Sequence, residues 1–89
     1  MTPDEIKRAV DAAIAKEFEL DPTRLVPAAH LVDDLGLDSL DSVDLIAAME
    51  KTFKVKCPEA EARQLRTVGD IHAFVERLIA ARGGAARVA

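Results

Sequence analysis

The sequence has no tryptophan or tyrosine, three phenylalanines and one cysteine, Cys57, among its 89 residues. A lone cysteine cannot form an internal disulfide, and no cluster of cysteine and histidine predicts a metal site. The shortage of aromatic side chains leaves little surface for stacking on bases or sugars. The core must therefore be mainly aliphatic, and the length suits one small domain.

Positive charge is missing from a long central stretch. Residues 25–50 contain no lysine or arginine and carry six acids, whereas the remainder has 12 basic and 10 acidic residues. Such a surface attracts basic protein partners and repels nucleic acid, so we expect no nucleic-acid binding. No apolar run is long enough to span a membrane, and the N-terminus lacks the apolar core of a signal peptide. These absences predict a cytoplasmic protein without membrane insertion.

Capping residues and apolar periodicity predict four helices. The first begins after Thr2, with Glu5 completing a capping box, and runs to about Lys16 or Phe18. The second covers about residues 39–53 and a short one about residues 59–65. The last opens at Thr67-Val68-Gly69-Asp70 and stops at Arg82-Gly83-Gly84.

The sequence shows no alternation of apolar and polar residues of the kind that predicts β-strands, so the expected fold class is all-α. We expect a small four-helix bundle, with three main helices plus one short helix, in which residues 1–82 form the domain and residues 83–89 a flexible C-terminal tail. Residues 19–38 form a long loop between the first and second helices, and such a loop is functional or packed by its own side chains. The candidates for that packing are Leu25, Val26, Leu31, Leu35 and Leu37.

The second helix has two apolar faces. With about 100° of rotation per residue, one face gathers the core candidates Ser42, Leu45, Ile46, Met49 and Phe53. The other face gathers Leu40, Val43 and Ala47, with acids along its borders: Asp41, Asp44 and Glu50. An apolar strip with acidic borders, facing away from the core, is typical of a docking surface.

Ser39 stands where the loop gives way to the second helix. Backbone N–H groups at a helix start point outward, and the helix dipole favours an anion there. Surrounded by acids such as Asp38 and without a nearby base, this serine is a poor nucleophile. It is a plausible attachment point for a covalent group that carries a phosphate.

The residues at this junction resemble those of the acyl carrier proteins. The resemblance rests on Asp33-Asp34-Leu35-Gly36-Leu37-Asp38-Ser39-Leu40-Asp41-Ser42-Val43-Asp44-Leu45, on the helix order and long first loop, and on Phe53, Pro58 and the Thr67-Val68-Gly69-Asp70 helix start. It covers about residues 3–80. Two positions depart from the family pattern: Lys51 replaces a common acid, and Ala47 replaces a larger apolar residue.

The resemblance implies a carrier that is not an enzyme. Ser39 would receive 4′-phosphopantetheine from coenzyme A through a phosphopantetheinyl transferase, with Asp38 as a second residue of the cofactor-binding site. The arm would carry acyl groups as thioesters. The implied pathway is fatty acid or related lipid biosynthesis, and the expected state is a monomer. Acyl-transfer and synthase enzymes with basic docking patches would recognise Leu40, Asp41, Val43, Asp44, Ala47 and Glu50. Ile46, Met49 and Ile71 are the candidate lining of an acyl cavity.

Several alternatives remain open from the residues alone. Ser39 could serve only as an N-cap, Ser42 is a weaker rival for attachment, and Leu40 with Val43 could pack under the first loop. The chain could be a specialised carrier of polyketide or aminoacyl units, or an unmodified helical interaction module. His30 and His72 are expected to have surface or packing roles, and Cys57 to be a small buried side chain.

Overall fold

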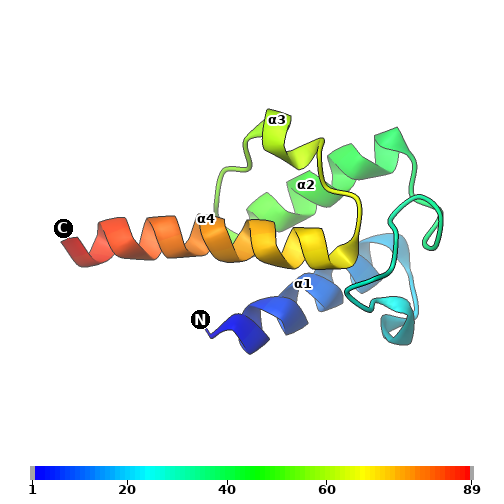
Figure 1. The fold of residues 1–89 in the computed structure, drawn as a ribbon, viewed down its shortest axis with the longest axis horizontal. Coiled ribbons are helices and arrows are strands. Elements are labelled where there is room, and N and C mark those ends of the chain that lie inside the picture. Colours follow the sequence, from blue (N-terminus) through cyan, green and yellow to red (C-terminus); the bar gives the residue numbers. More distant parts are fainter. Residues whose placement is uncertain (1, 89) are drawn as a thin grey trace.

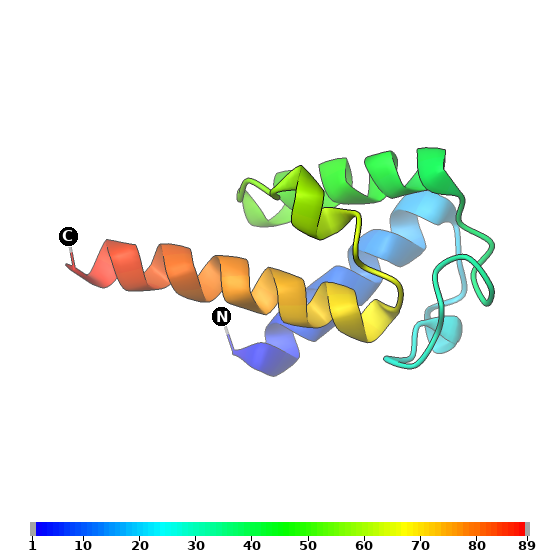
Figure 2. The same ribbon diagram turned by 45° about the horizontal axis from the view of Figure 1, so that its top comes forward.

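The computed structural model describes the backbone of residues 2–88 and the side chains of residues 2–38 and 40–81. The elements follow in the order α1 (Pro3–Phe18), the 3-10 turn η1 (Pro22–Arg24), α2 (Ser39–Phe53), α3 (Glu59–Ala62) and α4 (Val68–Val88). Helices α2 and α4 both pack on α1, and the short α3 lies in the connection that leads from α2 to α4 (Figures 1 and 2). The described residues contain no β-strand, only an isolated bridge between His30 and Thr67. The predicted all-α four-helix architecture is confirmed.

Side-chain caps begin the helices as predicted. The Glu5 N–H donates to the Thr2 hydroxyl while the Thr2 N–H donates to the Glu5 carboxylate, each over 3.2 Å. At the start of α4, the Asp70 N–H donates to the Thr67 hydroxyl at 3.1 Å. The Asp70 carboxylate accepts from the N–H groups of Arg66 and Thr67, and the first of these bonds contributes most to lowering the pKa of Asp70. These bonds satisfy N–H groups that a helix start leaves without partners.

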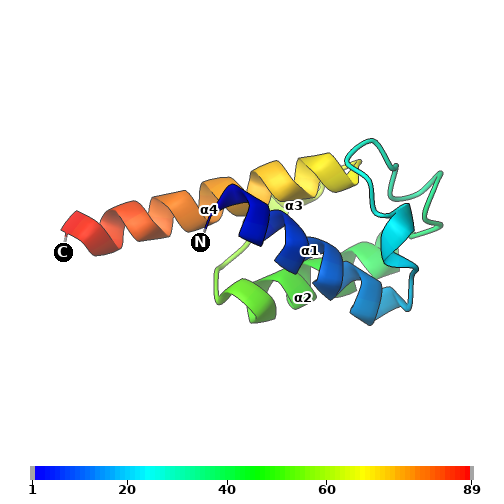
Figure 3. The same cartoon turned by 90° about the horizontal axis from the view of Figure 1, so that it is seen from below.

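The helix ends were predicted less well. The residues that follow α1 and α2, Glu19 and Lys54, adopt left-handed backbone angles with φ of 52° and 55°, although neither is glycine. Helix α4 does not stop at residues 82–84 but continues to Val88, and its last turns project beyond the other helices (Figures 1 and 3). The two glycines lower helix propensity without forbidding a helix, and the alanines and arginines on both sides favour one. The flexible tail predicted for residues 83–89 stays a prediction, since the side chains of these residues lie outside the described set.

The long first loop packs against the bundle. Its buried side chains are Leu25, Ala29, Leu31, Leu35 and Leu37. The expectation for Val26 is wrong, because half of its surface is exposed. The loop is also tied to the start of α4, where the Leu31 N–H donates to the Arg66 carbonyl at 2.8 Å and the Gly69 N–H to the Pro27 carbonyl at 2.9 Å. A Cβ at Gly69 would lie 3.0 Å from that Pro27 oxygen, so the close approach depends on glycine.

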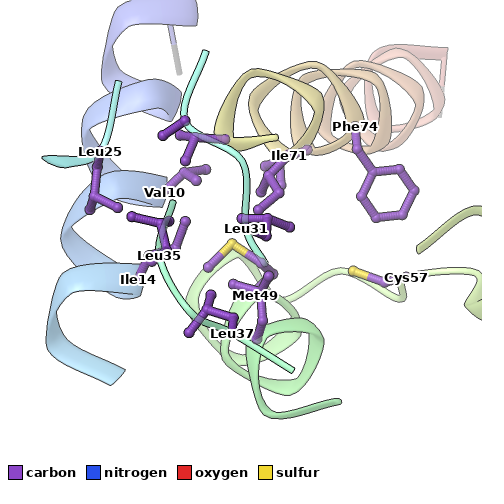
Figure 4. Close-up of a cluster of buried hydrophobic side chains, with 14 of the residues drawn as sticks. Val10, Ile14, Leu25, Leu31, Leu35, Leu37, Met49, Cys57, Ile71 and Phe74 are labelled. Atoms are coloured by element: carbon purple, nitrogen blue, oxygen red, sulfur yellow. The ribbon is translucent and has the colours of Figure 1, made fainter. Parts of the chain in front are cut away.

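The core lies where α1, α2, α4 and the loop meet. Figure 4 shows loop leucines and Met49 directed toward the side chains of α1 and α4. The helices contribute the following buried residues: Ile6, Val10, Ile14, Leu45, Met49, Phe53, Val68, Ile71, Phe74 and Val75. Phe74 was not among the predicted core residues, although it is almost completely buried. The loop and its leucines thus hold the start of α2 in a defined place relative to α1 and α4.

Candidate functional site

Ser39 is the first residue of α2, and its neighbour Asp38 is the cap. The Asp38 carboxylate accepts from the Asp41 N–H at 2.9 Å, and the Asp41 carboxylate accepts from the Asp38 N–H at 3.1 Å. The alternative in which Ser39 itself caps the helix is therefore wrong. The side chain of Ser39 lies outside the described set, but its backbone position places it in the first turn of a 15-residue helix.

The first turn of α2 is suited to a phosphodiester. Within the described residues the Leu40 N–H has no hydrogen-bond acceptor, and the Leu40 side chain is 76% exposed. A free N–H in the first turn, aligned with the helix dipole, favours an anion beside it. The loop reaches this turn through Gly36, whose φ of 72° is a left-handed angle that glycine adopts without strain. A phosphate ester on the neighbouring Ser39 therefore fits the local backbone.

The predicted recognition residues divide into two groups. Leu40, Val43, Asp44 and Ala47 are exposed, with Val43 at 67%, so the alternative of packing under the first loop is wrong for Leu40 and Val43. Asp41 and Glu50 are half-buried and already engaged, Asp41 in the cap and Glu50 as acceptor of the Cys57 N–H at 2.9 Å. The sequence thus predicted the exposed strip correctly. It did not reveal that two of the bordering acids, Asp41 and Glu50, accept hydrogen bonds from backbone N–H groups.

A groove of about 750 Å³ runs between α2 and α3. Its apolar lining consists of Val43, Ile46, Ala47, Cys57, Ala62 and Leu65, and its polar lining of Ser42, Glu50, Glu59 and Arg63. Ser42 is exposed at this groove and does not face the core as predicted. Its hydroxyl donates to the Asp38 carbonyl at 3.2 Å. That bond to a helix carbonyl was expected.

The three cavity candidates do not lie together at the groove. Ile46 is half-buried and lines it, whereas Met49 and Ile71 are completely buried in the core (Figure 4). Cys57 is buried beside the groove, as expected. Burial, together with the charge of Glu50, raises the pKa of its thiol to about 11, so the reactive thiolate is disfavoured at neutral pH.

One polar contact was missed by the sequence reasoning. His72 of α4 is only 4% exposed, and its Nε2–H donates to the carboxylate of Asp11 on α1 at 2.7 Å. The packing role expected for His72 is correct, but its partner lies 61 residues away, and no local pattern indicates such a pairing.

In the described part of the chain no group of three or more potential ligands could hold a metal ion. None of the described helices combines the length and apolarity needed to cross a membrane.

Comparison with known proteins bears on this site. Residues 8–75 match the sequence profile of the family described as "Phosphopantetheine attachment site". The chain is 43% identical over 81 residues to an acyl carrier protein of Thermosynechococcus vestitus, an alignment that covers 91% of this chain and all of that protein. The chain belongs to the acyl carrier protein family.

Two further members of that family are similar over most of the chain. An acyl carrier protein of Helicobacter pylori is 39% identical over 67 residues, which cover 75% of this chain and 86% of that protein. Acyl carrier protein 2 of Ralstonia nicotianae is 37% identical over 81 residues, which cover 91% of this chain and all of that protein. Acyl carrier proteins are carriers and not catalysts, which confirms that this chain is not an enzyme. Their cofactor is a covalently attached 4′-phosphopantetheine.

Proposed function

We propose that Ser39 is the residue that bears the 4′-phosphopantetheine arm. The observation that carries this proposal is its place in the first turn of α2, beside an exposed Leu40 whose N–H has no acceptor within the described residues. The capping box formed by Asp38 and Asp41 makes the turn rigid, so the hydroxyl is presented on a defined backbone. When attached, the arm supplies a terminal thiol that holds acyl groups as thioesters.

The chain then shuttles acyl intermediates between enzymes of fatty acid or related lipid biosynthesis. Its partners are a phosphopantetheinyl transferase and the synthase enzymes that form, use or transfer the acyl group, and it works as a cytoplasmic monomer. The exposed side chains nearest Ser39, namely Leu40, Val43 and Asp44, are available to these enzymes. Charged and apolar contacts on an exposed helix give fast, reversible encounters, which suit a carrier that visits several enzymes.

The groove between α2 and α3 offers space for the apolar part of a cargo. Its volume of about 750 Å³ lies within the range of small-molecule sites. Ile46 lines the groove, and we propose that Met49 and Ile71 line a deeper extension that an acyl chain opens in the core. A core of aliphatic residues and methionine can repack around such a chain more easily than one built from rigid aromatic rings.

Intact mass spectrometry tests the attachment site. The purified chain is incubated with coenzyme A and a broad-specificity phosphopantetheinyl transferase, and we expect the mass of one phosphopantetheine to be added. Ser39→Ala should abolish the gain, whereas the matched control Ser42→Ala, three residues further along α2, should retain it. A gain that survives Ser39→Ala but not Ser42→Ala would refute the assignment. The mass of the cargo on protein from its natural source would separate fatty acyl groups from polyketide or aminoacyl units.

A further inference from the structure

The charges on α2 differ in how far they are free to meet a partner. Asp38 and Asp41 are joined in the capping box, and Glu50 accepts from the backbone of the α2–α3 connection. Asp44 and Lys51 are both exposed, and neither side chain has a hydrogen bond or ion pair within the described residues. The helix therefore offers two uncommitted charges of opposite sign.

These two charges share one face of α2. Asp44 and Lys51 are seven residues apart, which is two helical turns and an axial distance of about 10 Å. Leu40 and Ala47 lie on the same face, because the positions 40, 44, 47 and 51 repeat at helical spacing. We call these four residues the two-sign ridge: an exposed apolar side chain, a negative charge, a small residue and a positive charge.

An enzyme that modifies Ser39 and docks along α2 covers this ridge. Lys51 lies 12 residues beyond Ser39, an axial distance of about 18 Å. A standard protein interface buries about 800 Å² on each partner, a patch roughly 30 Å across. A partner that holds Ser39 toward one edge of such a patch and extends along α2 therefore contacts both Asp44 and Lys51.

We propose that the two-sign ridge docks the phosphopantetheinyl transferase through a face of alternating charge. That face holds an apolar pocket for Leu40, a basic group opposite Asp44 and, about 10 Å further along, an acidic group opposite Lys51. A uniformly basic face would place a like charge against Lys51 and would be disfavoured. This inference rests on the proposed function, since it assumes that the transferase acts at Ser39.

Initial rates of loading test the inference. The transferase from the same organism is the probe, and kcat/KM for phosphopantetheine transfer is measured at low and high salt. Lys51→Glu should lower kcat/KM about threefold or more at low salt, because it turns one favourable exposed pair into a repulsive one. Lys51→Gln should give a smaller loss, and Asp44→Lys a loss comparable to that of Lys51→Glu. All of these effects should shrink at high salt.

A matched control separates docking from net charge. Lys7 is an exposed lysine on α1, outside the ridge, so Lys7→Glu makes the same change in net charge and should leave kcat/KM almost unchanged. Lys51 also complements the dipole at the end of α2, and thermal melts of each variant show whether that role affects folding.

The direction in which Lys51→Glu changes kcat/KM decides whether the inference holds. A lower rate supports an acidic group opposite Lys51, a higher rate shows a uniformly basic face, and an unchanged rate places Lys51 outside the interface. The last two results overturn the inference but leave the carrier intact. A folded chain that the active transferase does not load overturns the proposed function and this inference together.

Discussion

Breaking the contact between Asp11 and His72 should destabilise the fold, and the loss of unfolding free energy can be worked out from the structure. The carboxylate is the hydrogen-bond partner of an imidazole that is 4% exposed, and the bond joins α1 to α4. Asp11→Ala leaves the imidazole N–H buried without an acceptor, which costs about 2 kcal/mol. For a domain of this size that loss lowers the melting temperature by about 8–16 °C.

The assay is a double-mutant cycle in chemical and thermal unfolding. His72→Leu removes the donor while keeping an apolar side chain in the core, and the double variant removes both partners. We expect the double variant to lose at least about 1 kcal/mol less than the sum of the single losses, because no unpaired polar group remains. Glu17→Ala is the control, since Glu17 is an exposed acid on the same helix. Equal losses for Asp11→Ala and Glu17→Ala, or strictly additive effects in the cycle, would refute the reasoning.

Three further variants or measurements follow from local geometry. Asp38→Ala removes the cap of α2 and should cost about 1 kcal/mol in urea unfolding, whereas the exposed control Asp33→Ala should cost less than about 0.5 kcal/mol. Burial and the charge of Glu50 raise the pKa of the Cys57 thiol to about 11, so its alkylation rate should climb about tenfold per pH unit past pH 9. A rate that levels off near pH 9 would contradict this. Gly36→Ala should cost about 1 kcal/mol in the same unfolding assay, from its left-handed φ alone, because no described atom beyond the two adjoining residues lies within 4 Å of the added Cβ.

The helix starts could be predicted from the sequence because caps are local. Thr2 with Glu5, and Thr67 with Asp70, bond across three residues, and the capping pattern is visible in the residue types alone. Ser39 was predicted as the attachment site in the same way, from its position at the junction of a loop and an amphipathic helix. The sequence did not indicate that its neighbour Asp38, predicted as part of the cofactor-binding site, caps the helix.

Features that depend on distant parts of the chain could not be predicted. The pairing of Asp11 with His72 exists only after α1 and α4 have packed. The exposure of Ser42 is decided by how far the neighbouring α3 covers that face of α2, and a helical wheel contains no information about a neighbour. The left-handed residues Glu19 and Lys54 follow helices without the glycine that signals such an end.

The acidic stretch of residues 25–50 predicts the long-range electrostatic field of the protein, but it does not predict which carboxylates are free for direct contact with a partner. A hydrogen bond to a backbone N–H does not remove the charge of a carboxylate, so all six acids of residues 25–50 contribute to the field that steers a basic partner. Contact is different, because a carboxylate that caps a helix cannot turn toward a partner without exposing the N–H that it satisfies. On α2 this leaves Asp44 as the acid without such a bond in the described residues, with Lys51 as its counterpart of opposite sign. The salt dependence of association should therefore reflect the whole acidic stretch, whereas selectivity among partners should depend on these two residues.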